Sequence, residues 1–202
     1  MKSRGRALKG PMSPPRIIVA ITGGSGAPYA VRLLEVLPEK PDLIISDAGR
    51  QVIEFETGLK ASQVEALARR VFDNRDLAAA PASGSHKFDA LVIVPCSTTT
   101  LSKIAVGIGD NLVTRAAQVC LKERRKLVIV PRETPLSAIH LEQMAKLSAL
   151  GVTVLMAAPP WYIRPKTLDD FRNYMAGKIL DHIGVEHNLF PRWKQEEERP
   201  GD

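Results

Sequence analysis

The chain has 202 residues, 45% of them apolar and 25% charged, with 14 glycines and 15 prolines. This composition fits one compact domain with a substantial core, and it excludes a largely disordered, collagen-like or disulfide-rich protein. The net charge of +6 is 28 Lys and Arg minus 22 Asp and Glu, and residues 1–16 alone contribute +5. The basic character therefore belongs to the start of the chain, and we expect no nucleic-acid-binding surface.

The basic start does not continue into an export signal or a membrane span. The apolar stretch after it covers only residues 17–21 before Thr22 and two glycines interrupt it. No apolar run approaches the ~20 residues of a transmembrane helix. Two cysteines, Cys96 and Cys120, make no disulfide framework, and we expect a cytoplasmic protein with reduced thiols.

Short β-branched runs alternate along the chain with helical patterns. Residues 16–22 are typical of a buried strand, because they are rich in β-branched side chains and bounded by Pro15 and Gly23. The same criteria predict strands over residues 42–46, 90–94, 127–130 and 152–156. The predicted helices cover residues 27–37, 48–57, 61–72, 101–108, 112–123, 136–150 and 167–183, and a loop of small residues covers 80–85.

This alternation predicts a doubly wound α/β domain with a mostly parallel sheet, since each parallel crossover needs a helix. In such sheets ligands bind beyond the carboxyl ends of the strands. Most of these ends carry small, hydroxyl-bearing or charged side chains, which is typical of a phosphate and cofactor cleft. The ends are residues 23–26, 46–47, 95–98, 131–133 and 157–160.

The first of these ends, residues 23–26 (Gly-Gly-Ser-Gly), lies between a strand and a helix. Free backbone N–H groups and the helix dipole favour a phosphate there, and a tight turn without a ligand is the alternative. The loop is no dinucleotide fingerprint, because Tyr29 stands where the third glycine belongs, which also weakens Asp47 as a ribose-binding acid. Ser25 nearly fits a nucleophile elbow, but a hydrolase serine normally lies deeper in the sheet order.

Residues 95–100 follow the third predicted strand and include four consecutive hydroxyls. One is needed as a helix N-cap, and the others can line a phosphate or a polar ring edge. Cys96 beside them fits a small buried residue better than a nucleophile. Arg132 and Glu133 follow the fourth predicted strand, where opposite charges must pair or hold a ligand. We favour a ligand site for this pair, whereas residues 122–126 fit a solvated helix end.

The sequence shows no metal-ligand spacing. Asp169 and Asp170 could suggest a magnesium site, but Thr167 and Asp170 match the capping box of a helix, and acids suit its first turn. The histidines have neither an i, i+4 pair nor a cysteine partner for zinc. They are His86, His140, His182 and His187. We therefore expect no metal.

Taken in order, the motifs of this chain resemble those of the UbiX-type flavin prenyltransferases. The ordered set carries the resemblance, and no single motif does. The motifs are Ile21-Thr-Gly-Gly-Ser-Gly-Ala-Pro-Tyr29, Glu54-Phe-Glu-Thr57, Pro81-Ala-Ser-Gly-Ser85, Val94-Pro-Cys-Ser-Thr98, Asp110-Asn-Leu112, Leu121-Lys-Glu-Arg-Arg125, Val130-Pro-Arg-Glu-Thr-Pro-Leu136, Ile139-His-Leu-Glu142 and Leu189-Phe-Pro-Arg-Trp193.

The resemblance implies a Rossmann-like FMN-binding subunit that assembles into a dodecamer with active sites at subunit interfaces. Proteins of this family join a dimethylallyl group from its monophosphate to N5 and C6 of reduced FMN, without a metal. The prenylated FMN then serves UbiD-type decarboxylases. The expected domain covers residues 16–193, after a basic extension (1–15) and before a polar tail (194–202). Met12 is an alternative start.

The same resemblance implies roles for individual residues. The implied FMN contacts are Gly23, Gly24, Ser25, Ser46, Ser97, Thr98, Thr99, Thr100 and Arg132, with Arg115 as a further polar member. The implied prenyl-phosphate group is Lys122, Arg132, Glu133, Tyr162 and Lys178. The implied catalytic set is Ser25, Glu56, Lys122 and Glu133. Of these, Ser25 and Glu56 are placed near flavin N5, where a proton must leave after alkylation. The released phosphate then acts as base when the second bond forms.

The residues by themselves leave plainer interpretations open. Glu56 could lie on the surface, Tyr162 could close the core beside Trp161, and Lys178 could be solvated. Near the end of the chain, Phe190 and Trp193 could dock a neighbouring subunit or cover the site.

Two residues depart from the family pattern, and two other functions compete with the prenyltransferase. Asp47 stands where a Lys is common, and Lys178 stands where some members carry Arg. A Lys holds phosphate as a point charge, so monophosphate and diphosphate donors both stay open. The competing functions are an FMN-dependent decarboxylase of the phosphopantothenoylcysteine type and a non-catalytic flavin carrier.

Overall fold

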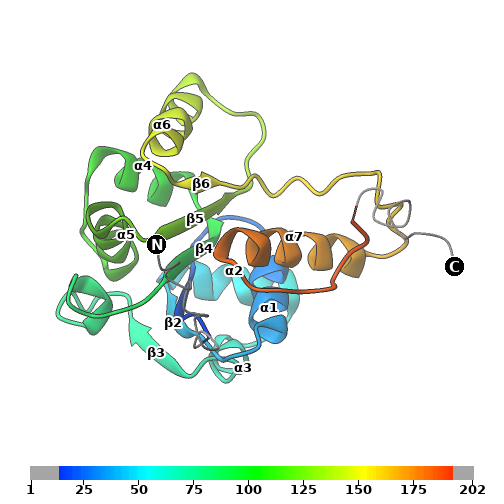
Figure 1. Ribbon diagram of the computed structural model, residues 1–202, viewed down its shortest axis with the longest axis horizontal. Coiled ribbons are helices and arrows are strands. Elements are labelled where there is room, and N and C mark those ends of the chain that lie inside the picture. Colours follow the sequence, from blue (N-terminus) through cyan, green and yellow to red (C-terminus); the bar gives the residue numbers. More distant parts are fainter. Residues whose placement is uncertain (1–13, 193–202) are drawn as a thin grey trace, which may run out of the picture.

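The computed structural model describes residues 14–192, and a six-stranded parallel sheet forms its centre (Figure 1). The strand order is β3-β2-β1-β4-β5-β6. The side chains of β1, β2 and β4 are all buried, as expected for parallel strands covered on both faces. The strands are β1 (Ile17–Ile21), β2 (Asp42–Ile45), β3 (Arg70–Asp73), β4 (Ala90–Cys96), β5 (Lys126–Pro131) and β6 (Thr153–Val154).

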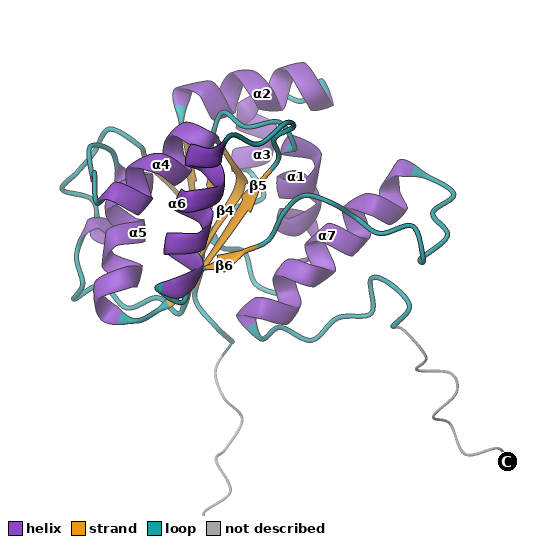
Figure 2. Ribbon diagram, turned by 90° about the horizontal axis from the view of Figure 1, so that it is seen from above, coloured by secondary structure: helices purple, strands orange, loops and turns teal. Residues whose placement is uncertain are grey.

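Helices cover both faces of this sheet (Figure 2). Alternate residues of β1 face opposite sides: Val19 packs in the layer that contains α1 and α7, and Ile18 packs in the layer that contains α4, α5 and α6. The doubly wound α/β prediction is therefore confirmed. The helices are α1 (Ala27–Val36), α2 (Asp47–Thr57), α3 (Ala61–Glu65), α4 (Thr98–Val106), α5 (Leu112–Glu123), α6 (Ala138–Ala149) and α7 (Leu168–Ile183), with a 3-10 turn η1 (Ala80–Ala82).

One predicted element is wrong. The helix predicted over residues 61–72 ends with α3, and the edge strand β3 follows, paired with β2. No side chain of β3 is buried, so the segment lacks the apolar run that marks a buried strand. The neighbouring strand β2 holds β3 in place. Asp42 of β2 is only 3% exposed and accepts hydrogen bonds from Arg69 (3.0 Å) and Arg70 (3.0 Å). Tertiary contacts therefore override the local helical pattern.

Smaller differences concern element ends. The helix predicted to begin at Leu101 begins at Thr98, because Ser97 caps it. The third predicted strand continues to Cys96, and the fifth keeps only two residues, Thr153–Val154. The first two shifts lengthen the elements that border the carboxyl end of β4.

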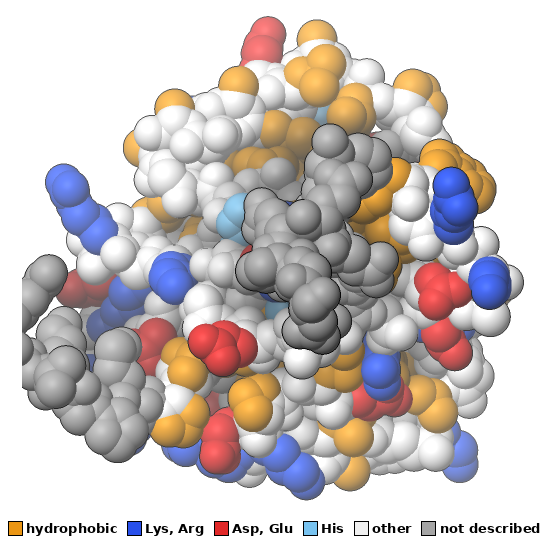
Figure 3. All heavy atoms as spheres, turned by 45° about the vertical axis from the view of Figure 1, so that its right-hand side comes forward, with side chains coloured by type: hydrophobic (Ala, Val, Ile, Leu, Met, Phe, Trp, Pro, Cys, Tyr) orange, Lys and Arg blue, Asp and Glu red, His pale blue; other side chains and the backbone are white. Residues whose placement is uncertain are grey.

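Residues 1–13 and 193–202 lie outside the described residues, and with them Trp193 and most of the predicted extension and tail. Across residues 14–192, no helix combines the length and apolar character that crossing a membrane requires. On the face shown in Figure 3, Lys and Arg side chains are interspersed with Asp and Glu, with apolar side chains between them.

The strand order determines where a ligand can bind. The connections from β1 and from β4 lead to opposite faces, because α1 packs in one layer and α4 in the other. In open α/β sheets such a reversal marks the ligand-binding crevice, and we expect it here beyond the carboxyl ends of β1 and β4. The loop after β1 and the first turn of α4 border this crevice.

Candidate functional site

The loop after β1 and the start of α4 are joined through Thr22. Its Oγ1 donates to the carbonyl oxygen of Pro95 (2.8 Å) and accepts from the N–H of Ser97 (2.8 Å). A Cβ placed on Gly24 would lie 3.2 Å from the nitrogen of Ser97, so a side chain at this position would crowd the backbone at the start of α4 and push the two loops slightly apart. The structure thus brings together the glycine loop and the hydroxyl-rich segment. Thr22 itself was not predicted, since its position is that of the last residue of a strand.

Glu56 lies against the N-terminus of α1. Its Oε2 accepts hydrogen bonds from the N–H groups of Gly26 (2.8 Å) and Ala27 (2.8 Å). The next residue, Pro28, has no N–H to offer a ligand. The carboxylate of Glu56, and not the phosphate expected there, therefore occupies this helix N-terminus. Glu56 is an exposed residue of the described chain, so it lies on the surface with two backbone partners. Sequence spacing hides this contact, because α2 must fold back onto the loop to make it.

The N-terminus of α4 is closed by an uncharged cap instead. The Oγ of Ser97 accepts from the N–H of Thr100 (3.2 Å) and donates to its Oγ1 (2.9 Å), which confirms the predicted N-cap. The N–H groups of Thr98 and Thr99, in the first turn, have no acceptor within the helix. With the helix dipole behind them, these groups and the threonine hydroxyls fit a phosphate. Ser46 likewise caps α2, accepting from Gly49 N–H (3.0 Å).

Arg132 and Glu133 follow β5 at the same edge of the sheet. The two form no ion pair with each other, and within residues 14–192 the hydrogen bond of Glu133 is to the N–H of Thr134 (3.1 Å). The charge of Arg132 acts on Tyr29 of α1: burial and then Glu56 raise the pKa of Tyr29, while Arg132 and Arg172 oppose the rise. The ligand-site interpretation of Arg132 and Glu133 stays a prediction.

Tyr162 and Lys178 lie on the side of the molecule formed by α7. The segment before α7 extends away from the body (Figure 1), and Tyr162 is 47% exposed, so the interpretation that it closes the core is wrong. Its hydroxyl donates to that of Tyr174 (3.4 Å), and Lys178 pairs with Asp181 (3.7 Å). At the start of α7, Asp170 accepts from the N–H of Thr167 (2.8 Å), which confirms the capping box.

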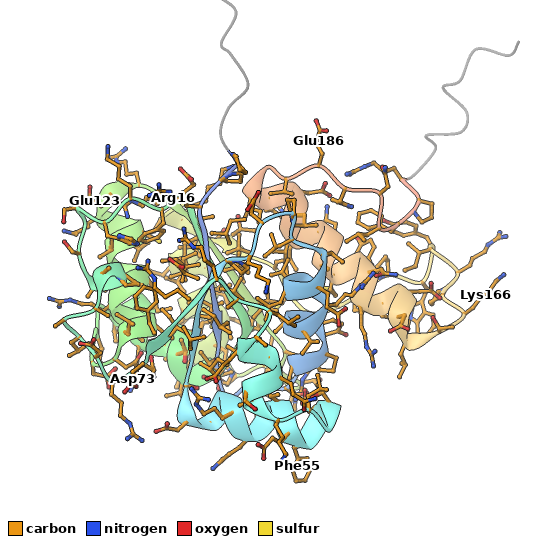
Figure 4. All side chains as sticks on the ribbon, turned by 90° about the horizontal axis from the view of Figure 1, so that it is seen from below. Arg16, Phe55, Asp73, Glu123, Lys166 and Glu186 are labelled. Carbon is orange, nitrogen blue, oxygen red and sulfur yellow. The ribbon has the colours of Figure 1, made fainter. Side chains whose placement is uncertain are left out.

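Arg115 and Lys122 are on α5 and are not brought to Glu56. They are seven residues apart, and so they share one face of the helix. Lys122 pairs with Glu123 (3.4 Å) and its side chain is 62% exposed. Figure 4 shows Glu123 at the upper left of the molecule and Phe55 at its bottom edge. Because Phe55 is the neighbour of Glu56, one chain cannot place Lys122 beside that carboxylate.

Residues 14–192 contain no group of three or more His, Cys, Asp or Glu side chains arranged to hold a metal ion. A polar hollow of about 520 Å³ opens beside Glu56, between α1, the end of α2 and the start of α7. Arg32 and Arg172 line it together with Glu35 and Asp169. The charges around Glu56 are therefore mixed in sign.

Comparison with known proteins shows the family of this chain. The Flavoprotein family matches residues 6–178. The flavin prenyltransferase UbiX of Methanocaldococcus jannaschii is 47% identical over 180 residues, which cover 88% of this chain and 98% of that protein. This chain belongs to the flavin prenyltransferases of the Flavoprotein family. The family assignment confirms the prenyltransferase interpretation over a phosphopantothenoylcysteine-type decarboxylase and over a non-catalytic carrier.

Two solved structures of the family share the fold closely. The crystal structure of AnUbiX (PadA1) in complex with FMN and dimethylallyl pyrophosphate has a TM-score of 0.87 and 38% identity, covering 90% of this chain and 98% of that one. A dodecameric FMN-dependent UbiX-like decarboxylase from Escherichia coli O157:H7 has a TM-score of 0.85 and 43% identity, covering 88% and 98%. The described fold is thus the fold of this family.

The two cysteines are buried thiols. Cys96 and Cys120 are 1% and 0% exposed, and burial raises the pKa of each from 9.0 to about 12. Because the folded state disfavours the thiolate, stability falls as the pH rises from about 9 toward 12. We predict that iodoacetamide at pH 8 leaves both thiols of the native protein unmodified and alkylates both in denaturant, as read by intact mass. Alkylation of the native protein would contradict this.

Replacing Glu56 by Gln tests its role as a proton acceptor. The amide oxygen in the Glu56→Gln variant can still accept from the N–H groups of Gly26 and Ala27, so the fold and FMN affinity should stay unchanged. We expect the single-turnover rate of adduct formation to fall at least ~100-fold, the usual contribution of a positioned base. Glu54→Gln, on the same helix, is the control and should leave the rate as it is. A Glu56→Gln rate equal to that of the unsubstituted protein would remove Glu56 from the mechanism.

Proposed function

We propose that the crevice between the glycine loop and α4 binds reduced FMN, and that the chain transfers to it a dimethylallyl group from dimethylallyl phosphate. The observation that carries this proposal is that the glycine loop after β1 holds the carboxylate of Glu56 on one side and is joined through Thr22 to the serine-capped start of α4 on the other. Bound FMN supplies N5 and C6 as the atoms that receive the prenyl group. The domain that does this is residues 16–193.

The FMN phosphate fits the first turn of α4. Thr98 and Thr99 present N–H groups and hydroxyls there, and the helix dipole adds a partial positive charge. Arg132 supplies a full positive charge at the neighbouring strand end. Gly23, Gly24 and Ser25 let the flavin approach the backbone of the loop, with Ser46, Ser97 and Thr100 shaping the rest of the contact surface.

Glu56 is the proton acceptor in this proposal. Its Oε2 is held by two backbone N–H groups, which fixes the carboxylate and leaves Oε1 as the oxygen assigned to the reaction. Oε1 takes the proton that leaves N5 after alkylation, and Ser25, in the same loop, completes the polar contact. A carboxylate already fixed by the fold needs no reorganisation during the reaction.

The prenyl donor is held by its phosphate. Breaking the C–O bond increases the negative charge on that phosphate, and fixed cations stabilise the charge as it forms. Arg132, Lys178 and Lys122 supply the cations, with Tyr162 and Glu133 as hydrogen-bonding partners. The released phosphate moves the proton when the second bond forms: it gives a proton to the double bond of the prenyl chain and takes back the proton that leaves C6. Both dimethylallyl monophosphate and diphosphate are candidate donors.

The complete site spans more than one copy of the chain. Lys122 and Arg115 lie on one face of α5, and the elements around Glu56 within one subunit are α1, α2 and α7. A second copy that presents its α5 face to the crevice supplies both cations, in a dodecamer such as the Escherichia coli relative forms. The product is handed to a UbiD-type decarboxylase. Two free cysteines fit a reducing compartment such as the cytoplasm.

The proposal is tested by anaerobic incubation of the purified protein with reduced FMN and either dimethylallyl monophosphate or diphosphate. Mass spectrometry of the extracted flavin should show one added C5 unit with at least one donor, which also identifies that donor. Unmodified FMN with both donors, from a folded and flavin-loaded protein, would contradict the proposed transfer. A reaction without protein is the control for non-enzymatic addition.

Sharing of the site between subunits predicts complementation. Oligomers made only of Glu56→Gln subunits or only of Lys122→Ala subunits should be inactive, because every shared site in them lacks Glu56 or Lys122. Co-expressed with different affinity tags and purified through both, the mixed oligomers should regain part of the activity, since some sites then combine an intact Glu56 with an intact Lys122. Mixed oligomers without activity would contradict a shared site. Two Glu56→Gln chains with different tags form the matched control.

A further inference from the structure

The last described residues of the chain lie along one stripe of α7. Tyr174, Gly177, Lys178 and Asp181 follow the i, i+3, i+4, i+7 spacing of a single helix face. The segment 187–192 runs back along this helix (Figure 1). Side chains of this segment and the proposed donor-binding residue Lys178 therefore share the same face.

Asp181 is the anchor of this segment. Its carboxylate accepts from both terminal nitrogens of Arg192 (2.7 and 3.2 Å). It also accepts from Nε2 of His187 (3.2 Å), because Nδ1 of that ring accepts from the N–H of Leu189 (3.2 Å) and so leaves the proton on Nε2. The same carboxylate lies 3.7 Å from Nζ of Lys178. One partly buried group thus holds three side chains.

Aromatic packing continues the contact toward Tyr162. A Cβ on Gly177 would lie 2.5 Å from Phe190 and 2.6 Å from His187, so both rings rest directly on the helix backbone. The ring of Phe190 packs on Tyr174 (centroids 4.8 Å apart), and Tyr174 meets Tyr162 edge-on (6.3 Å). A continuous series of contacts therefore runs from the anchored segment to Tyr162.

We propose that Asp181 is a positioning residue of the prenyl-donor site, which holds Lys178 directly and Tyr162 through Phe190 and Tyr174. The inference rests on the proposed donor-binding roles of Tyr162 and Lys178. Asp181 is no proton acceptor in this scheme, because its oxygens are already bound.

The charge of Asp181 persists at neutral pH. Burial raises its pKa, but Arg192 and His187 outweigh burial and hold the pKa below its ordinary value. The carboxylate therefore keeps its hold on Lys178 and Arg192 under the conditions of the reaction.

The test is Asp181→Asn in the full chain, with kcat, the KM for the prenyl donor and the Kd for FMN measured separately. We expect the donor KM to rise about tenfold, within the range of energies that couple contacting residues, and the Kd for FMN to stay within about twofold. Arg192→Gln should raise the donor KM similarly, and the double variant should add little. A substitution that disturbs the whole fold would instead raise the FMN Kd and the donor KM together.

The control is Glu65→Gln, which removes a matched ion pair elsewhere. The N···O distance is 2.7 Å both in the Arg50–Glu65 pair and in the Arg192–Asp181 pair. The arginine side chains are 40% and 44% exposed, and the carboxylate side chains are 26% and 24% exposed. Glu65→Gln should leave the donor KM unchanged. If Asp181→Asn does not fold, Gly177→Ala displaces the rings by another route and should raise the donor KM.

An unchanged donor KM in a folded Asp181→Asn or Gly177→Ala variant would overturn the positioning role, as would an equal rise of donor KM and FMN Kd. The unsubstituted protein separates this failure from that of the proposed function. If it forms no prenylated flavin, the transfer itself is refuted and the positioning role falls with it. If it forms the product while the variants keep its donor KM, only the role of Asp181 is refuted.

Discussion

The candidate site depends on the placement of β1 and β4 side by side at the centre of a parallel sheet. Both strands are buried on both faces, so their backbone groups must be satisfied by neighbouring strands, and their side chains must be apolar. Polar side chains that can contact a ligand are therefore confined to the strand ends. There the chain departs toward α1 on one face and α4 on the other, and the divergence opens the crevice. Thr22, buried at the end of β1, ties the two exits together.

Two helix N-termini border this crevice, and their backbone N–H groups have different acceptors. At α1 a carboxylate from α2 covers the N–H groups, while at α4 a neutral serine caps the helix and leaves the first-turn N–H groups available. Partial positive charge is thus neutralised on one side and available on the other. This polarity suits a ligand with an anionic group at one end and an atom that loses a proton at the other. FMN has both features.

The cations of the proposed donor site are dispersed over one chain. Arg132 lies beside the crevice, Lys178 on α7, and Arg115 and Lys122 on one face of α5. Gathering them all within one subunit would place several like charges together in a poorly solvated site, which is costly without a bound anion. Distributing them over neighbouring copies keeps each cation solvated until the subunits and the phosphates meet. Under the proposed function, assembly of the oligomer completes the binding site.

The sequence by itself determined the layered fold and the strand ends that carry polar chemistry, because burial on both faces leaves an apolar signature in β1, β2, β4 and β5. It also determined the capping box of Thr167 and Asp170 and the need for a hydroxyl N-cap within residues 97–100, since caps act within a few residues, but not that Ser97 is that cap. It did not reveal β3, whose exposed edge has no such signature and is held by Asp42. Nor did it show Glu56 on the α1 N-terminus or Asp181 beneath the C-terminal segment. Those contacts depend on how separate segments pack together, and only tertiary packing decides which backbone donors and cations a carboxylate meets.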